Sequence, residues 1–236
     1  MYHVLFYFRA MRILIIALLL LLIPTINNVG FARFNAGKAF SEDLYSAVNL
    51  TDSGLSRNIF NLAIKGLIKL DAKGRLQNST ILTIADYSQS SSNKRLYVID
   101  LKNKKLLFNT FVAHGRNTGS EFAKNFSNQE GSLKSSLGFY ITLNPVIGLH
   151  TGLSLILDGV EKGINDHAGK RAIIMHGADY ATADFIKKYG RLGRSQGCPA
   201  LPPEMNKPII ESIKGGTCLF IYNPDNKYIQ NSSLLN

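Results

Sequence analysis

Cysteine, acidic residues and long hydrophobic runs are scarce in this chain of 236 residues, and tryptophan is absent. Two cysteines are too few for a small disulfide-held scaffold or for a four-cysteine zinc site. The 16 acidic residues face 27 lysines and arginines, which gives a formal net charge of +11. This charge fits either an anionic partner or a solvated basic surface. With 45% hydrophobic residues, the chain can bury a core and is not disordered.

The longest apolar run, Ile13 to Ile23, is too short to cross a membrane. It spans about 16 Å, roughly half of the hydrocarbon core. Arg9 and Arg12 precede it, and Gly30-Phe31-Ala32 supplies the small residues of a cleavage site. We therefore expect a cleaved signal peptide over residues 1–32, no stable membrane anchor after cleavage, and an exported protein in the periplasm or the cell wall. No cysteine lies directly after the run, where a lipid would be attached, which excludes a bacterial lipoprotein.

Export bears on the identity of the anionic partner. Nucleic acid is not expected, because an exported protein does not meet it and the lysines are not gathered beside aromatic residues. A cell-wall polymer or lipid headgroups fit the charge better. The pattern gives no indication of the oligomeric state.

Residues 33–75 are predicted to form a helical segment that packs on the main domain as an N-terminal cap. Apolar residues recur at helical spacing on both sides of a break at Thr51-Asp52-Ser53-Gly54, and Gly74 marks the end.

Short runs rich in Ile, Val, Tyr and Phe follow and are typical of strands. They cover residues 80–87, 95–101, 105–113, 139–143, 153–157, 171–176 and 217–222. Asn103-Lys104 is a predicted hairpin turn, and short helices are expected over 183–189 and 202–213. This order predicts a mainly β domain, a β-sandwich or open barrel with short helices, over residues 76–225. Residues 226–236 are expected to be a C-terminal tail.

His176 and Cys198 are the residues best suited to chemistry. A thiol titrates near 8.5 and needs a base to attack at neutral pH. His176 ends a predicted strand, and the connection to Cys198 is long enough to fold back. Gly197 lets a substrate carbonyl approach, and the N–H groups around it could face an oxyanion. Taken alone, the histidine could be a core residue and the cysteine a small buried hydrophobe.

Together these residues resemble a known signature. His176-Gly177 followed by Ser195-Gln196-Gly197-Cys198 resembles the YkuD-type L,D-transpeptidases, and it is close to their murein L,D-transpeptidase catalytic-domain branch. The resemblance runs from about Tyr97 to Tyr222 and includes residues 112–117, 136–140 and 197–201. The commoner family form has His where Gln196 stands, so the role of Gln196 is left open.

The resemblance implies an exported enzyme that acts on peptidoglycan stem peptides. Cys198 would attack the carbonyl of the third stem residue, D-Ala would leave with a proton from His176, and a thioester would remain. An amine of a second stem would resolve the thioester and form a cross-link. Water would make the enzyme a carboxypeptidase, and a protein lysine is a third possible acceptor. The further residues that the resemblance places around the oxyanion and the substrate are Gly197, Ser195, Gly177, Arg194 and His114.

Several expectations complete this interpretation. A neighbouring imidazolium should hold the pKa of Cys198 below the free value near 8.5, and Cys218 should be a buried thiol in its strand. No cofactor or metal is expected, because the histidines show no metal-binding spacing. A sortase is excluded because no arginine follows Arg194. A decayed, basic wall-binding module without a reactive thiol remains the alternative.

Overall fold

The computed structural model describes residue 41 and residues 43–236, and the predicted signal segment lies outside them. The strands are β1 (Ile81–Asp86), β2 (Leu96–Asp100), β3 (Lys105–Thr110), β4 (Gly138–Gly148), β5 (Gly152–Gly159), β6 (Ile174–Gly177), β7 (Ala200–Leu201) and β8 (Cys218–Tyr222). The helices are α3 (Arg57–Ala72), α4 (Ala183–Tyr189), α5 (Pro203–Ile213) and α6 (Asn226–Asn231), with a 3-10 turn over Asp179–Ala181. Within the described part of the chain, no helix is long and apolar enough to cross a membrane.

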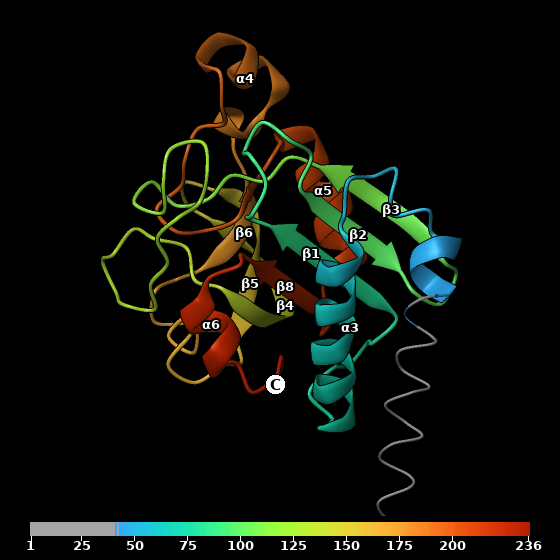
Figure 1. The fold of residues 1–236 in the computed structure, drawn as a ribbon. Helices are drawn as coiled ribbons and strands as arrows, with labels where there is room; N and C mark the ends of the chain where they lie inside the picture. The colour runs from blue at the N-terminus through green and yellow to red at the C-terminus, as the bar shows by residue number, and fades with distance from the viewer. Residues whose placement is uncertain (1–40, 42) are drawn as a thin grey trace, which may run out of the picture. The chain divides into compact units, whose positions relative to one another are not determined.

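The eight strands form one mixed sheet in the order β3-β2-β1-β8-β4-β5-β6-β7 (Figure 1). Pairing is parallel between β1 and β8 and between β6 and β7, and antiparallel elsewhere. Just beyond β3, Ala113 pairs with Ala200 of β7, with N···O distances of 2.8 and 3.2 Å. This bridge joins the two ends of the sheet into a nearly closed barrel. The predicted mainly β class, in its open-barrel form with short helices, is confirmed.

The centre of the sheet is buried on both faces. Every residue of β1 and β8 is buried, which explains their continuous apolar runs. The rings of Phe139 and Phe220 stack with centroids 4.2 Å apart. Helix α3 packs here through Gly66, where an added Cβ would lie 2.0 Å from Cζ of Phe139. Glycine is therefore needed for the helix to approach the sheet this closely.

Besides the longer β4 and the unpredicted strand β7, two segments differ from the sequence prediction. The strand expected over 171–176 begins only at Ile174, because Ala172 has a left-handed φ of +50°. The chain after residue 225 forms α6, which begins where the Asp225 side chain accepts the Tyr228 N–H. Beyond α6, Leu234 and Leu235 are buried, and Lys65 of α3 donates to the Leu235 carbonyl at 2.5 Å.

A buried carboxylate, Glu161, joins this C-terminal segment to β4. It accepts hydrogen bonds from Phe139 N–H at 2.8 Å, from the Tyr228 hydroxyl at 3.2 Å and from the Ser232 hydroxyl. Burial raises the pKa of Glu161 above its ordinary value, although the three hydrogen bonds partly oppose the shift.

Replacing Glu161 with alanine is expected to lower the free energy of unfolding by about 3 kcal/mol, because three buried donors lose their acceptor. Urea unfolding followed by circular dichroism measures this. Because the pKa of Glu161 is higher in the folded state, stability depends on pH. The stabilising contribution of Glu161 is complete below its unfolded pKa and is lost as pH rises through the folded pKa. Glu161→Gln should therefore gain stability relative to the parent protein between pH 4 and pH 7. A free energy of unfolding of Glu161→Gln that falls relative to that of the parent protein over this range would contradict the raised pKa.

Candidate active site

Parallel pairing of β6 with β7 brings the predicted catalytic residues together. His176 pairs with Ala200, and its N–H approaches the Pro199 carbonyl at 3.4 Å. Cys198 lies two residues before Ala200 and is therefore level with Ile174. The Ile174 N–H interacts with the sulfur. Neighbouring strands lie about 4.8 Å apart, so the register holds His176 of β6 beside Cys198, which lies just before β7.

The His176 ring is held in one tautomer. Its Nδ1 lies 2.9 Å from the Gly177 carbonyl, and a carbonyl can only accept, so Nδ1 carries the proton. Nε2 is then the basic nitrogen. The side chain is 7% exposed. Gly177, predicted to shape the site, thus orients the imidazole through its own carbonyl.

The Cys198 thiol is half-buried, and its Sγ lies 3.8 Å from the Ala172 carbonyl. Burial raises the pKa of Cys198, and the Ile174 N–H and the positive charge of Arg171 only partly offset this. The expected depression of the thiol pKa is therefore wrong, because loss of hydration outweighs the favourable groups. A neutral resting thiol needs a base for attack.

The turn that carries the cysteine is held by two serines. The Ser195 hydroxyl accepts the Gly197 N–H at 3.0 Å and donates to the Cys198 carbonyl at 2.6 Å. The Ser135 hydroxyl donates to the Gly197 carbonyl at 3.0 Å. The Gly197 N–H is thus occupied, whereas the Cys198 N–H has no acceptor among the described residues. Cys198 N–H is therefore a backbone donor available for an oxyanion at this turn.

A glycine is required at position 197 because neighbouring atoms lie very close to its backbone. Its φ is +130°, and an added Cβ would lie 3.0 Å from the Lys134 carbonyl and 3.3 Å from Nη2 of Arg171. Backbone and guanidinium pack directly against the glycine, so a side chain here would displace the turn.

Arg171 is a site residue that the sequence interpretation missed. Its guanidinium donates to the Ser127 carbonyl at 2.9 Å, to the Lys134 carbonyl at 2.5 Å and to the Ser136 hydroxyl. It therefore fastens residues 127–136 against the cysteine turn. The only sequence signal was a charged residue at the entrance to an apolar strand.

Arg194 and His114 lie beside this turn. Arg194 donates to the Gly119 carbonyl at 3.2 Å and remains half-exposed. His114 is 1% exposed, its Nδ1 accepts from Arg95 at 2.8 Å, and its Nε2 lies 3.3 Å from the Gly119 carbonyl. Burial and the charge of Arg95 lower the pKa of His114 to about 3, so its imidazole is neutral at pH 7. Its substrate-shaping role stays a prediction, and both ring nitrogens already have protein partners.

A cleft of about 450 Å³ opens on the histidine side of the pair. It is lined by the tip of the β4–β5 hairpin, the segment after β6 and the start of α5. The lining residues are His150, Thr151, His176, Gly177, Ala178, Asp179, Tyr180, Pro203 and Asn206. The pKa of Tyr180 is raised to about 12, first by burial and then by the negative charge of a Cys198 thiolate.

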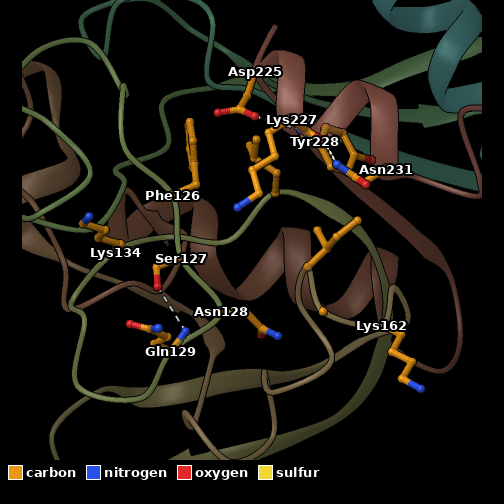
Figure 2. Close-up of a pocket in the computed structure, with 13 residues that line it drawn as sticks. Phe126, Ser127, Asn128, Gln129, Lys134, Lys162, Asp225, Lys227, Tyr228 and Asn231 are labelled. Atoms are coloured by element: carbon orange, nitrogen blue, oxygen red, sulfur yellow. Dashed lines mark hydrogen bonds between the residues drawn. The ribbon is translucent and has the colours of Figure 1, made fainter.

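A second hollow, of about 570 Å³, is lined in part by the segment that Arg171 fastens. Figure 2 shows Lys227 extending from α6 into it, toward Phe126. Lys134 and Lys162 stand at its edges, and its carboxylate, Asp225, is engaged at the start of α6. The surface on this side of the site is cationic.

The described residues contain no group of three or more histidine, cysteine, aspartate or glutamate side chains suited to a metal ion. Cys198 and Cys218 are free thiols, and Cys218 is buried in β8. Burial raises the pKa of Cys218 far above that of a free thiol. The residues placed together at the site are thus a thiol, an imidazole, backbone donors and arginines.

A family model and several solved structures match this chain. The family model of the L,D-transpeptidase catalytic domain, YkuD_2, matches residues 51–222. No curated protein matches the sequence. Among solved structures, the chain is similar to an L,D-transpeptidase from Mycobacterium smegmatis, with 11% identity, a TM-score of 0.38 and coverage of 61% of this chain and 59% of that chain. It is also similar to the helical cell shape determining protein Pgp2 from Campylobacter jejuni, with 15% identity, a TM-score of 0.42 and coverage of 67% and 53%.

The chain therefore spans less than two thirds of the length of either solved structure. The family match itself takes in most of the sheet, the histidine strand and the cysteine turn. The resemblance seen in the sequence is confirmed, and the chain belongs to the L,D-transpeptidase catalytic domain family.

Proposed function

We propose that this protein is an exported L,D-transpeptidase that cross-links peptidoglycan through a thioester on Cys198. The observation that carries the proposal is the β6–β7 register, which sets His176 beside a cysteine turn with a free N–H. Family membership supports an enzyme that acts on peptidoglycan. Export rests on the apolar run at Ile13 to Ile23 and the small residues after it.

In the first half-reaction, Nε2 of His176 takes the proton from the Cys198 thiol as the sulfur attacks the third-residue carbonyl. The oxyanion forms opposite the Cys198 N–H. When the intermediate collapses, the C–N bond breaks and D-Ala leaves with the proton from His176. A thioester remains, and the imidazole is neutral again and ready for the second half-reaction.

Two cationic side chains lie near the turn that carries the thiol. Arg171 sits against Gly197, and Arg194 stays half-exposed at the start of the turn. A stem peptide carries carboxylates, and a guanidinium binds a carboxylate through two parallel hydrogen bonds. We assign Arg194 to the carboxylate of the donor stem, since Arg171 is already engaged with protein carbonyls.

Incubation of the mature protein with a tetrapeptide stem tests the function. We expect release of D-Ala and a cross-linked dimer, both visible by mass spectrometry. A hydrolysed tripeptide without dimer would identify the carboxypeptidase alternative. A protein that binds isolated cell wall but releases no D-Ala would be the decayed wall-binding module.

A further inference from the structure

The hollow of Figure 2 is lined by three lysines whose ammonium groups are not engaged by the protein. Lys162 and Lys227 are exposed, and Lys134 is half-buried. Within the part of the chain that the structure describes, none of the three side chains takes part in an ion pair or a hydrogen bond. Unpaired ammonium groups around one hollow attract anionic ligands.

The carboxylates of this region already have donors. Asp225, the carboxylate of the lining, accepts the Tyr228 N–H at 2.8 Å. Asp166 lies next to the lining and accepts the Gly163 N–H at 2.8 Å and an amide N–H of Asn128 at 2.7 Å. The lining therefore carries three ammonium groups and one carboxylate, and its charge is positive.

Apolar side chains line the hollow between the lysines. Leu137 and Tyr228 are buried, and Phe126 and Ile164 pack half-buried against the main core. Figure 2 shows the ring of Phe126 beside Lys227. Aromatic rings pack well against the C–H face of a sugar, because both surfaces leave water. The lining therefore suits a carbohydrate that carries negative charges.

The lysines stand too far apart for one small anion. Figure 2 shows Lys134 and Lys162 on opposite sides of the hollow, with Lys227 between them. A single phosphate or carboxylate cannot contact all three. A chain with repeated anionic groups can, and each contact after the first then forms at a high effective concentration.

The hollow and the cysteine turn share one wall. The Lys134 carbonyl accepts from Arg171 at 2.5 Å and would lie 3.0 Å from an added Cβ on Gly197, while the Lys134 side chain lines the hollow. Ser127 is placed in the same way, with its carbonyl 2.9 Å from the Arg171 guanidinium. A polymer in the hollow therefore lies next to the turn that carries Cys198.

We propose that this hollow binds the glycan strand of peptidoglycan beside the stem that reacts at Cys198, an inference that rests on the proposed function. The lysines bind carboxylates of neighbouring stems, which recur along the strand, and Phe126 packs against a sugar ring. No bond forms or breaks in the hollow. It holds the strand so that a stem stays near the thiol, and the enzyme consequently prefers a polymeric donor to an isolated stem.

Binding of uncross-linked glycan strands with tetrapeptide stems tests this inference. Lys162→Gln combined with Lys227→Gln removes two charges and spares Lys134, whose backbone packs against the cysteine turn. In Cys198→Ala protein, which cannot consume the ligand, this pair of substitutions should weaken strand binding about fivefold, as expected for two exposed charges. Lys102→Gln with Lys105→Gln removes two exposed lysines at the β2–β3 turn. This matched control should leave the affinity unchanged.

Turnover with Cys198 intact gives a second measurement. Lys162→Gln with Lys227→Gln should raise the KM for the strands about fivefold and leave kcat/KM for an isolated tetrapeptide stem unchanged. Strands stripped of their stems should bind the parent protein and this variant equally weakly. A KM that rises equally for strands and for the isolated stem would overturn the inference. So would binding to phosphatidylglycerol vesicles that falls as much as strand binding does, because the hollow would then recognise a lipid surface.

The inference and the proposed function can fail separately. If the lysine variant binds and processes strands like the parent protein while D-Ala is still released, the hollow is not a strand site and the proposed function stands. If the parent protein forms no acyl-enzyme but the lysine variant loses strand binding, the hollow is a wall-binding site and the proposed transpeptidase is wrong.

Discussion

Cys198→Ala should abolish D-Ala release. It should also abolish the covalent adduct that we expect a carbapenem, whose strained carbonyl a thiolate can attack, to form with the parent protein. Without the sulfur no thioester can form, so the expected loss of turnover is at least a thousandfold. Intact-mass measurement after carbapenem treatment detects the adduct directly. Cys218→Ala is the matched control, since its thiol is buried in β8. It should retain most activity and lose about 1 kcal/mol of unfolding free energy.

The pH dependence of acylation tests the base. Since burial raises the pKa of Cys198, the uncatalysed thiol reacts mainly at alkaline pH. His176→Ala should therefore slow carbapenem labelling strongly near neutrality and much less at high pH, where hydroxide ionises the thiol. If His176→Ala is labelled at the parental rate near pH 7, Cys198 is still the nucleophile but His176 is not its base.

Arg171→Met is expected to give the second-largest effect, a fall of about a hundredfold in acylation at neutral pH. The variant removes the positive charge that lowers the pKa of Cys198 and releases the segment that packs against Gly197. The pH midpoint of thiol alkylation by iodoacetamide should consequently move upward. Tyr87 and Tyr180 interact electrostatically with Cys198, which helps to raise the pKa of each phenol. Both phenols are neutral at these pH values, so neither contributes a charge to thiolate formation.

Two further variants separate charge from attachment at Arg171. Arg171→Lys keeps the charge but cannot span the Ser127 and Lys134 carbonyls with one planar group. It should restore the alkylation midpoint without restoring the full acylation rate. Arg194→Met is the matched control and should weaken donor binding while leaving the midpoint unchanged. A midpoint that Arg171→Met does not move would leave Arg171 with a purely structural role.

Much of the fold could be predicted because its signals are local. Alternating and β-branched runs marked seven of the eight strands to within a few residues, apart from the much longer β4. The two-residue strand β7 was missed, since two residues carry no periodicity. The approach of His176 to the cysteine turn was also foreseeable, because the connection between a strand end and a glycine turn can fold back and bring the two together.

The rest of the site depends on partners that the sequence does not mark. Arg171 binds backbone carbonyls that lie 37 and 44 residues earlier in the chain, and any residue can supply a carbonyl. The pKa of Cys198 was predicted in the wrong direction because hydration depends on burial, which residue spacing does not reveal.

The parallel register of β6 and β7 also bears on how such an enzyme can diversify. Neighbouring strands, not the connection between them, set the separation of His176 and Cys198. Within that connection, α4 buries none of its residues, and Figure 1 shows it standing away from the sheet. Residues 182–190 are therefore free to lengthen, shorten or be exchanged without moving the reacting atoms. Evolution can rebuild the approach to the cleft there while inheriting the chemistry unchanged.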